Sequence, residues 1–152
     1  MAWEFSVLVV ANVTAESAEL LAALRERSDA GACRFTLVMP GSRRERLDAA
    51  LEHMREAGLD NVEGGIGDPD PVVAVMDVWD PMKFDDIVVS TLPTGSSRWM
   101  GLDLPHRLEK LTSVQVRHVV SQPPRPEVQT EPVPEKPRYG VLAAFAALIT
   151  RR

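Results

Sequence analysis

Short apolar runs alternate with segments of helical periodicity over residues 1–121, and this alternation limits the fold more than any other feature of the chain. Val7–Val10 is a continuous apolar run, which is typical of a strand covered on both faces. A helix is clearest where apolar side chains recur at spacings of three and four, at Leu47, Ala50, Leu51, Met54 and Ala57. The apolar runs predict five strands, at residues 5–11, 34–39, 61–66, 87–90 and 114–120, with four helices between them.

Strands and helices that alternate in this way predict a Rossmann-like, doubly wound α/β domain, with a five-stranded parallel sheet and helices on both faces. Right-handed crossovers restrict the topology to a few strand orders, of which we expect 3-2-1-4-5. A length of 152 residues and a hydrophobic fraction of 45% suit one domain with one core.

Local signals mark where the helices begin and which faces they bury. Thr14 or Ser17 can cap the first helix, Ser42 is placed to cap the second, and Asp70 precedes Pro71 at the start of the third. The third helix is expected to bury Val72, Val73, Met76 and Trp79. The last helix is expected to begin near Asp103 and Pro105, and to bury Leu104, Leu108 and Leu111.

The composition changes after Ser121, where the α/β domain of residues 1–121 is expected to end. Residues 122–137 include six prolines interleaved with charges, which predicts an extended, semi-rigid linker. Residues 138–152 are expected to form a short apolar C-terminal helix, too short to span a bilayer. That helix could rest on a membrane surface, dock on a protein partner, fold back onto its own domain or pack within a homodimer.

Charge and cysteine content narrow the functional classes. The formal net charge of −5 argues against nucleic acid as a partner, because phosphates favour a cationic surface. Cys33 is the single cysteine, so no intrachain disulfide can form. The apolar run near the N-terminus has neither a preceding basic region nor a cleavage signature, so we predict a strand, no signal peptide and a cytoplasmic protein.

Four features in this order resemble the universal stress protein family. They are the spacing of the nine predicted elements, Gly67-Asp68-Pro69 before the third helix, Phe84-Asp85-Asp86-Ile87-Val88-Val89 leading into the fourth strand, and the distance from there to the last strand. The resemblance implies a small cytosolic α/β domain, often a homodimer, from a family with an ATP-binding branch and a branch that does not bind ATP.

The ATP-binding branch carries a glycine motif after the fourth strand, and this chain departs from it. The glycine and serine positions of the motif fall on Ser90, Pro93, Asp103 and Leu104. The family's acidic residue at the end of the first strand falls near Asn12. The resemblance therefore implies ATP or AMP as the ligand class, without the family's usual binding residues.

In an open α/β sheet, ligands bind beyond the carboxyl ends of the strands where the strand order reverses, here between the first and fourth strands. The segment Thr94–Arg98 is rich in small and hydroxyl residues, and its backbone N–H groups with the Arg98 guanidinium could hold a phosphate. A simple turn capped by a serine is the alternative. The predicted cofactor-binding residues are Asn12, Val13, Met39, Gly41, Thr94, Gly95, Ser96, Ser97 and Arg98.

Two functions stay open on this evidence. One is a nucleotide- or anion-sensing, stress-response domain without catalytic activity. The other is a ligand-free dimeric module that engages a partner through its C-terminal segment. A small hydrolase is a weaker third, because Ser96, His106 and Asp103 lack the Gly-x-Ser-x-Gly elbow, and the three histidines lack the spacing of a metal site.

Overall fold

A computed structural model describes residues 4–93, 99 and 103–122 of the chain, and these residues form the predicted α/β domain. The elements are β1 (Phe5–Val10), α1 (Ala18–Ala30), β2 (Cys33–Pro40), α2 (Arg44–Glu56), β3 (Val62–Gly67), α3 (Pro71–Val78), β4 (Asp86–Thr91), α5 (Leu104–Thr112) and β5 (Val116–Val120). The strands pair in parallel in the order β3-β2-β1-β4-β5, which confirms the predicted topology. In the described part of the chain, no helix is long and apolar enough to cross a membrane.

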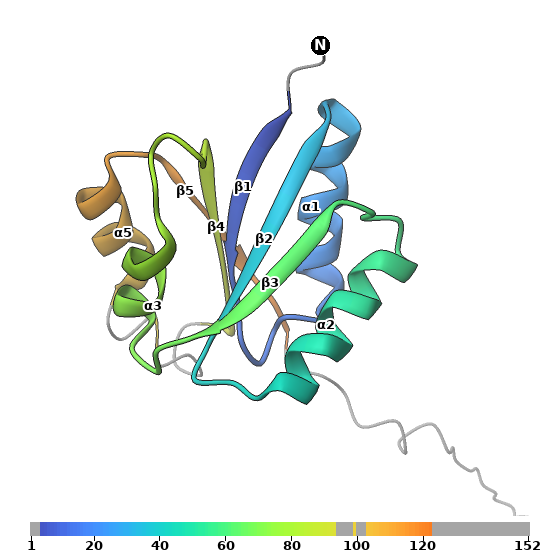
Figure 1. The fold of residues 1–152 in the computed structure, drawn as a ribbon, viewed down its shortest axis with the longest axis horizontal. Helices are drawn as coiled ribbons and strands as arrows, with labels where there is room; N and C mark the ends of the chain where they lie inside the picture. The colour runs from blue at the N-terminus through green and yellow to red at the C-terminus, as the bar shows by residue number, and fades with distance from the viewer. Residues whose placement is uncertain (1–3, 94–98, 100–102, 123–152) are drawn as a thin grey trace, which may run out of the picture.

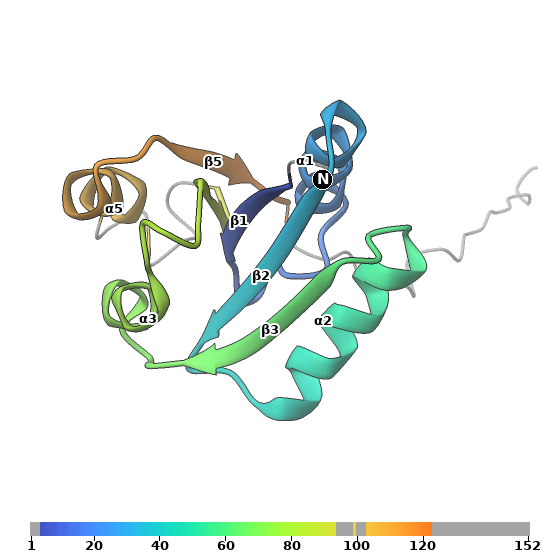
Figure 2. The same ribbon diagram turned by 45° about the horizontal axis from the view of Figure 1, so that its top comes forward.

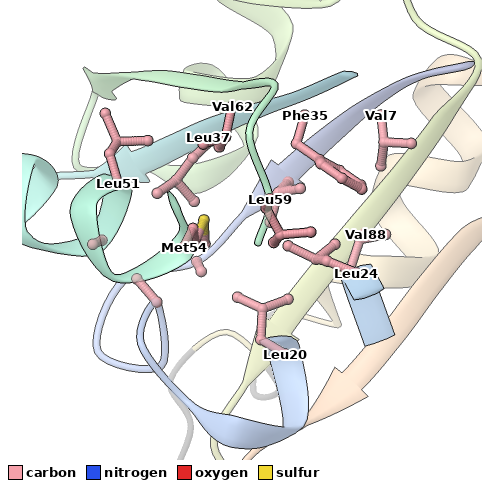
Figure 3. Close-up of a cluster of buried hydrophobic side chains, with 14 of the residues drawn as sticks. Val7, Leu20, Leu24, Phe35, Leu37, Leu51, Met54, Leu59, Val62 and Val88 are labelled. Carbon is pink, nitrogen blue, oxygen red and sulfur yellow. The ribbon is translucent and has the colours of Figure 1, made fainter. Parts of the chain in front are cut away.

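The helices cover the two faces of the sheet, α1 and α2 on one and α3 and α5 on the other (Figures 1 and 2). The face beneath α1 and α2 carries the larger apolar cluster, in which Phe35 and Leu37 of β2 meet Leu20 and Leu24 of α1 and Met54 of α2 (Figure 3). The opposite cluster joins side chains of β1 and β4 to α3 and α5. Because successive strand residues point to opposite faces, the continuous apolar runs supply both clusters.

Two glycines of β3 permit close packing on opposite faces of the sheet. A Cβ on Gly64 would lie 2.7 Å from the Leu37 carbonyl oxygen, and one on Gly67 would lie 2.6 Å from the Ala74 Cβ of α3. Glycine weakens the sequence signal for the strand β3, but these close contacts leave no room for a larger side chain at Gly64 or Gly67.

The buried face of α3 agrees with the prediction only in part, since Val72 and Trp79 are partly buried against the apolar cluster. The structure buries Pro71, Ala74 and Val75, whereas Val73 and Met76 are exposed. Seven of the eight residues of α3 are apolar, so the sequence has little polar contrast to mark a face. The small Ala74 side chain faces the sheet because it is the one that fits against Gly67.

Two further local predictions were wrong. Leu111 of α5 is 52% exposed, because the buried stripe runs through Leu104, Leu108 and Thr112 at intervals of four residues. Ser42 does not cap α2, which begins after Arg43 without a side-chain cap among the described residues. By contrast, Ser17 caps α1 and Asp70 caps α3, as predicted.

Candidate functional site

The candidate site lies at the carboxyl edge of the sheet, where β1, β2 and β4 end side by side (Figure 1). Asn12 follows β1, Gly41 follows β2 and Leu92 follows β4. The chain leaves β1 for α1 on one face and leaves β4 toward α5 on the other, so the strand order reverses here as predicted. This is the edge at which open α/β sheets bind ligands.

Asn12 is held by hydrogen bonds at both ends of its amide. Its Nδ2 donates to the Pro40 carbonyl oxygen at 2.8 Å, and its Oδ1 accepts from Arg46 Nη1 at 2.8 Å. Arg46 Nη2 also donates to the Asn12 carbonyl oxygen at 3.2 Å. These bonds join the end of β1, the end of β2 and the first turn of α2, and they place a partly buried guanidinium at the candidate site.

Gly41 turns the chain from β2 toward α2 with a positive φ of 64°. Its N–H donates to the Gly67 carbonyl oxygen at 2.9 Å, and an added Cβ would lie 3.2 Å from the Pro69 Cα. The left-handed conformation and the close approach of Pro69 both favour glycine. Gly41 therefore shapes the loop by its backbone and brings it against Gly67-Asp68-Pro69.

The start of α2 offers hydrogen-bond donors. The Ser42 hydroxyl oxygen is buried and has no hydrogen-bond partner among the described residues, and α2 has no side-chain cap there. Uncapped N–H groups at a helix N-terminus carry a partial positive charge that favours anions. With Arg46 alongside, this corner of the domain has the chemistry of an anion site.

Sequence reasoning missed Arg46 and gave Ser42 a different role. The signal for Arg46 was the run Ser42-Arg43-Arg44-Glu45-Arg46, in which three arginines fall within the start of one helix. Nothing in the sequence says which of the three turns toward Asn12, because that depends on the rotation of α2 against the sheet.

The other predicted site residues fall into three groups. Val13 is 54% exposed beside Asn12, so its side chain is available to a ligand. The Met39 side chain is fully buried in the apolar cluster beneath α1 and α2, so only its backbone can take part. Thr94, Gly95, Ser96, Ser97 and Arg98 lie outside the described residues.

A buried chain of hydroxyl groups runs beside the site. Ser90 Oγ lies 2.7 Å from Thr14 Oγ1 and 3.1 Å from Ser121 Oγ, and Ser121 Oγ lies 2.8 Å from Ser17 Oγ. Ser17 Oγ then accepts from the Leu20 N–H at 3.0 Å. The Ser90 hydroxyl thus joins β4 to the segment that precedes α1.

On the opposite face, His118 of β5 contacts Thr91 of β4. The Nε2 atom lies 2.7 Å from Thr91 Oγ1, whose hydroxyl also bonds the Leu92 carbonyl oxygen at 2.9 Å. Partial burial lowers the pKa of His118, which favours the neutral ring. Across the described ranges, no three histidine, cysteine or acidic side chains are grouped as a metal site requires.

Comparison with known proteins gives matches among solved structures alone. No protein-family model matches the chain, and no curated protein matches it. A crystal structure of a universal stress protein in complex with cAMP matches with a TM-score of 0.55 and 18% identity, covering 80% of this chain and 100% of that one. Protein Rv1636 from Mycobacterium tuberculosis H37Rv has a TM-score of 0.43 and 23% identity, covering 74% of this chain and 91% of that one. With its five parallel strands in the order 3-2-1-4-5 and helices on both faces, the chain has the fold of the universal stress proteins.

Proposed function

We propose that the protein is a cytoplasmic stress-response domain that binds an adenine nucleotide, such as ATP or AMP, or a related phosphate anion, without catalytic activity of its own. The observation that carries the proposal is the corner formed by Asn12, Arg46 and Ser42 at the start of α2. It combines a guanidinium with a hydroxyl and a helix N-terminus that, within residues 4–93 and 103–122, have no hydrogen-bond partner and no side-chain cap, and each of these favours a phosphate.

The position of this corner supports a nucleotide rather than a lone anion. Gly41 and the exposed Val13 flank it, so backbone groups and an apolar side chain lie beside the phosphate donors. The universal stress protein that shares the fold is described in complex with cAMP, a ligand with an adenine ring and a phosphate. Because the chain lacks the family's glycine motif at Ser90, we locate the phosphate at the start of α2, where Arg46 and Ser42 lie.

Isothermal titration calorimetry with ATP, AMP and cAMP tests the proposal. Replacing Arg46 by glutamine removes a charged donor, which is worth about 1.5–3 kcal/mol and so about tenfold or more in affinity. Arg25→Gln removes the same charge from an exposed position on α1 and should leave affinity unchanged. Absence of binding heat at millimolar ligand, with the protein shown to be folded, would reject the proposal.

The second candidate function is a dimeric interaction module. It is favoured by β5, an edge strand whose Val120 is 45% exposed. An edge strand presents unpaired backbone groups that a second copy can satisfy. Sedimentation of the protein and of a Val120→Lys variant distinguishes this candidate: a dimer that the lysine converts to monomer supports it, and a wild-type monomer excludes it.

A further inference from the structure

A groove lies on the α3 face of the sheet, and its lining residues Gly67 and Asp68 adjoin the Gly41 turn of the candidate site. It has a volume of about 370 Å³ and runs between α3 and the strands β2 and β3. Gly65 lines it, and a Cβ added to Gly65 would meet nothing within 4 Å. The helix α3 is only eight residues long, so it leaves this part of the sheet face open beside it.

The groove has an apolar interior and acidic side chains at its rim. Val78 lines it and is 42% exposed, and Gly65 faces the same space with no side chain to fill it, so apolar surface is left in contact with water. Burial of such surface is a main driving force for association. Glu63, Asp68 and Asp77 also line the groove and are exposed, and no basic residue is among its lining residues.

A segment near the C-terminus of the sequence is basic where the groove is acidic. Residues 138–152 contain three arginines and no acidic residue, in a chain whose formal net charge is −5. The arginines are Arg138, Arg151 and Arg152, and the uncharged run Val141–Ile149 lies between them. An apolar run with arginines at both ends complements an apolar groove with three acidic side chains around it.

The linker is long enough for the segment to reach the groove of its own domain. Fifteen residues separate Gln122, the last described residue, from Arg138, and in extended form they span about 45 Å. The five-stranded sheet is about 19 Å wide from β5 to β3, since neighbouring strands lie about 4.8 Å apart. Gln122 and the groove-lining Gly67 and Asp68 follow the carboxyl ends of parallel strands, so they share one edge of the sheet.

We propose that residues 138–152 dock in the groove between α3 and β3 of their own domain. The apolar run covers Gly65 and Val78, and the flanking arginines pair with Glu63, Asp68 and Asp77. Docking also covers the outer edge of β3, which is otherwise open to pairing with another chain. Tethering helps, because it makes docking intramolecular, at an effective concentration set by the length and stiffness of the linker.

Paramagnetic relaxation tests the docking in the full-length protein. A nitroxide is attached to an Ala147→Cys variant in a Cys33→Ser background, and amide signals are compared before and after reduction of the label. We expect loss of signal at Gly65, Ala74 and Val78, with Glu52 on α2 and Lys110 on α5 unaffected. Undiminished signals at the groove, or equal losses on α2 and α5, would overturn the proposal.

Two controls make the result specific. Mixing isotope-labelled protein without nitroxide with unlabelled nitroxide-bearing protein should leave the groove signals intact. Losses in that mixture would show that a second copy fills the groove and would overturn docking within one chain.

The Glu63→Lys/Asp77→Lys variant, shown to be folded by its amide spectrum, should lose the effect of the nitroxide, whereas Glu19→Lys/Asp29→Lys on α1 should keep it. Survival of the effect in the groove variant would contradict the proposed charge pairing.

Discussion

Arg46 donates from Nη1 to the side-chain oxygen of Asn12 at 2.8 Å, which links the first turn of α2 to the end of β1. The pair lies where the strand order reverses, and Ser42 precedes the same helix α2. The bond holds the guanidinium in place before any ligand arrives, so less side-chain entropy is lost on binding. Asn12 therefore acts as a positioning residue for Arg46 in the proposed site.

Asn12→Ala should destabilise the fold as well as weaken ligand binding. The substitution removes the bonds to Pro40 and Arg46, and hydrogen bonds of this kind contribute about 0.5–1.5 kcal/mol each. Urea denaturation should show a loss of about 1–3 kcal/mol in the free energy of unfolding. Asn12→Ser, which is shorter but polar, should fall between alanine and wild type. An alanine variant as stable as wild type would show that the hydrogen bonds of Asn12 do not contribute to the free energy of unfolding.

The hydroxyl chain centred on Ser90 gives a second prediction. Ser90→Ala leaves Thr14 and Ser121, both at most 2% exposed, without their shared partner. A buried polar group left unsatisfied costs about 1–3 kcal/mol, so thermal or urea unfolding should shift by that amount. Ser28→Ala on α1, a partly exposed position, is the matched control and should change stability by less than about 0.5 kcal/mol. Equal effects of the two substitutions would contradict a role for the chain of hydroxyls.

Gly65 and Gly67 of β3 should differ in how much stability the same substitution costs. In Gly67→Ala the new methyl would lie 2.6 Å from the Ala74 Cβ, and separating α3 from the sheet should cost about 1–3 kcal/mol. In Gly65→Ala the methyl enters the open groove, and the unfolding free energy should change by less than about 1 kcal/mol. Denaturation of both variants checks this, and similar losses would show that α3 does not pack as described.

Protonation of His118 should destabilise the protein at low pH. Burial lowers the pKa of His118 in the folded state, so the unfolded chain binds more protons in the window below its unfolded pKa of about 6.5. This contribution to stability is present above that window and declines as the pH falls through it toward the lowered folded pKa. His118→Gln should flatten the pH dependence of the unfolding free energy between about pH 5 and 7. An unchanged slope in the variant would assign the dependence to other groups.

The sequence predicted the sheet in full because its strands are continuous apolar runs with helices between them. Strand bounds agree with the structure within two residues, and the order 3-2-1-4-5, chosen from the few that right-handed crossovers allow, is confirmed. The sequence did not predict correctly which face of two helices is buried. Helix α3 is apolar almost all round, and Leu111 lies one position outside the buried stripe of α5. In both helices the buried face is set by the residues of the sheet that the helix packs against, and the sequence does not show which residues these are.

The candidate site was predictable in location and only partly in composition. The switch-point rule selected this edge and the loops after β1 and β2, including Asn12 and Gly41, whose part in binding stays a prediction. It assigned Met39 to the site because the residue is near the end of β2, although the strand turns this side chain into the apolar cluster. Arg46 was missed because its contact with Asn12 joins residues 34 positions apart in the chain.

An amide NMR titration of the full-length protein with ATP tests the central claim most directly. The account predicts that the amides of Val13, Gly41, Ser42 and Arg43 shift together and saturate with one affinity, and that Arg46→Gln weakens this response while Arg25→Gln does not. Shifts that cluster elsewhere on the domain, or a spectrum that stays unchanged at millimolar ATP, would contradict it.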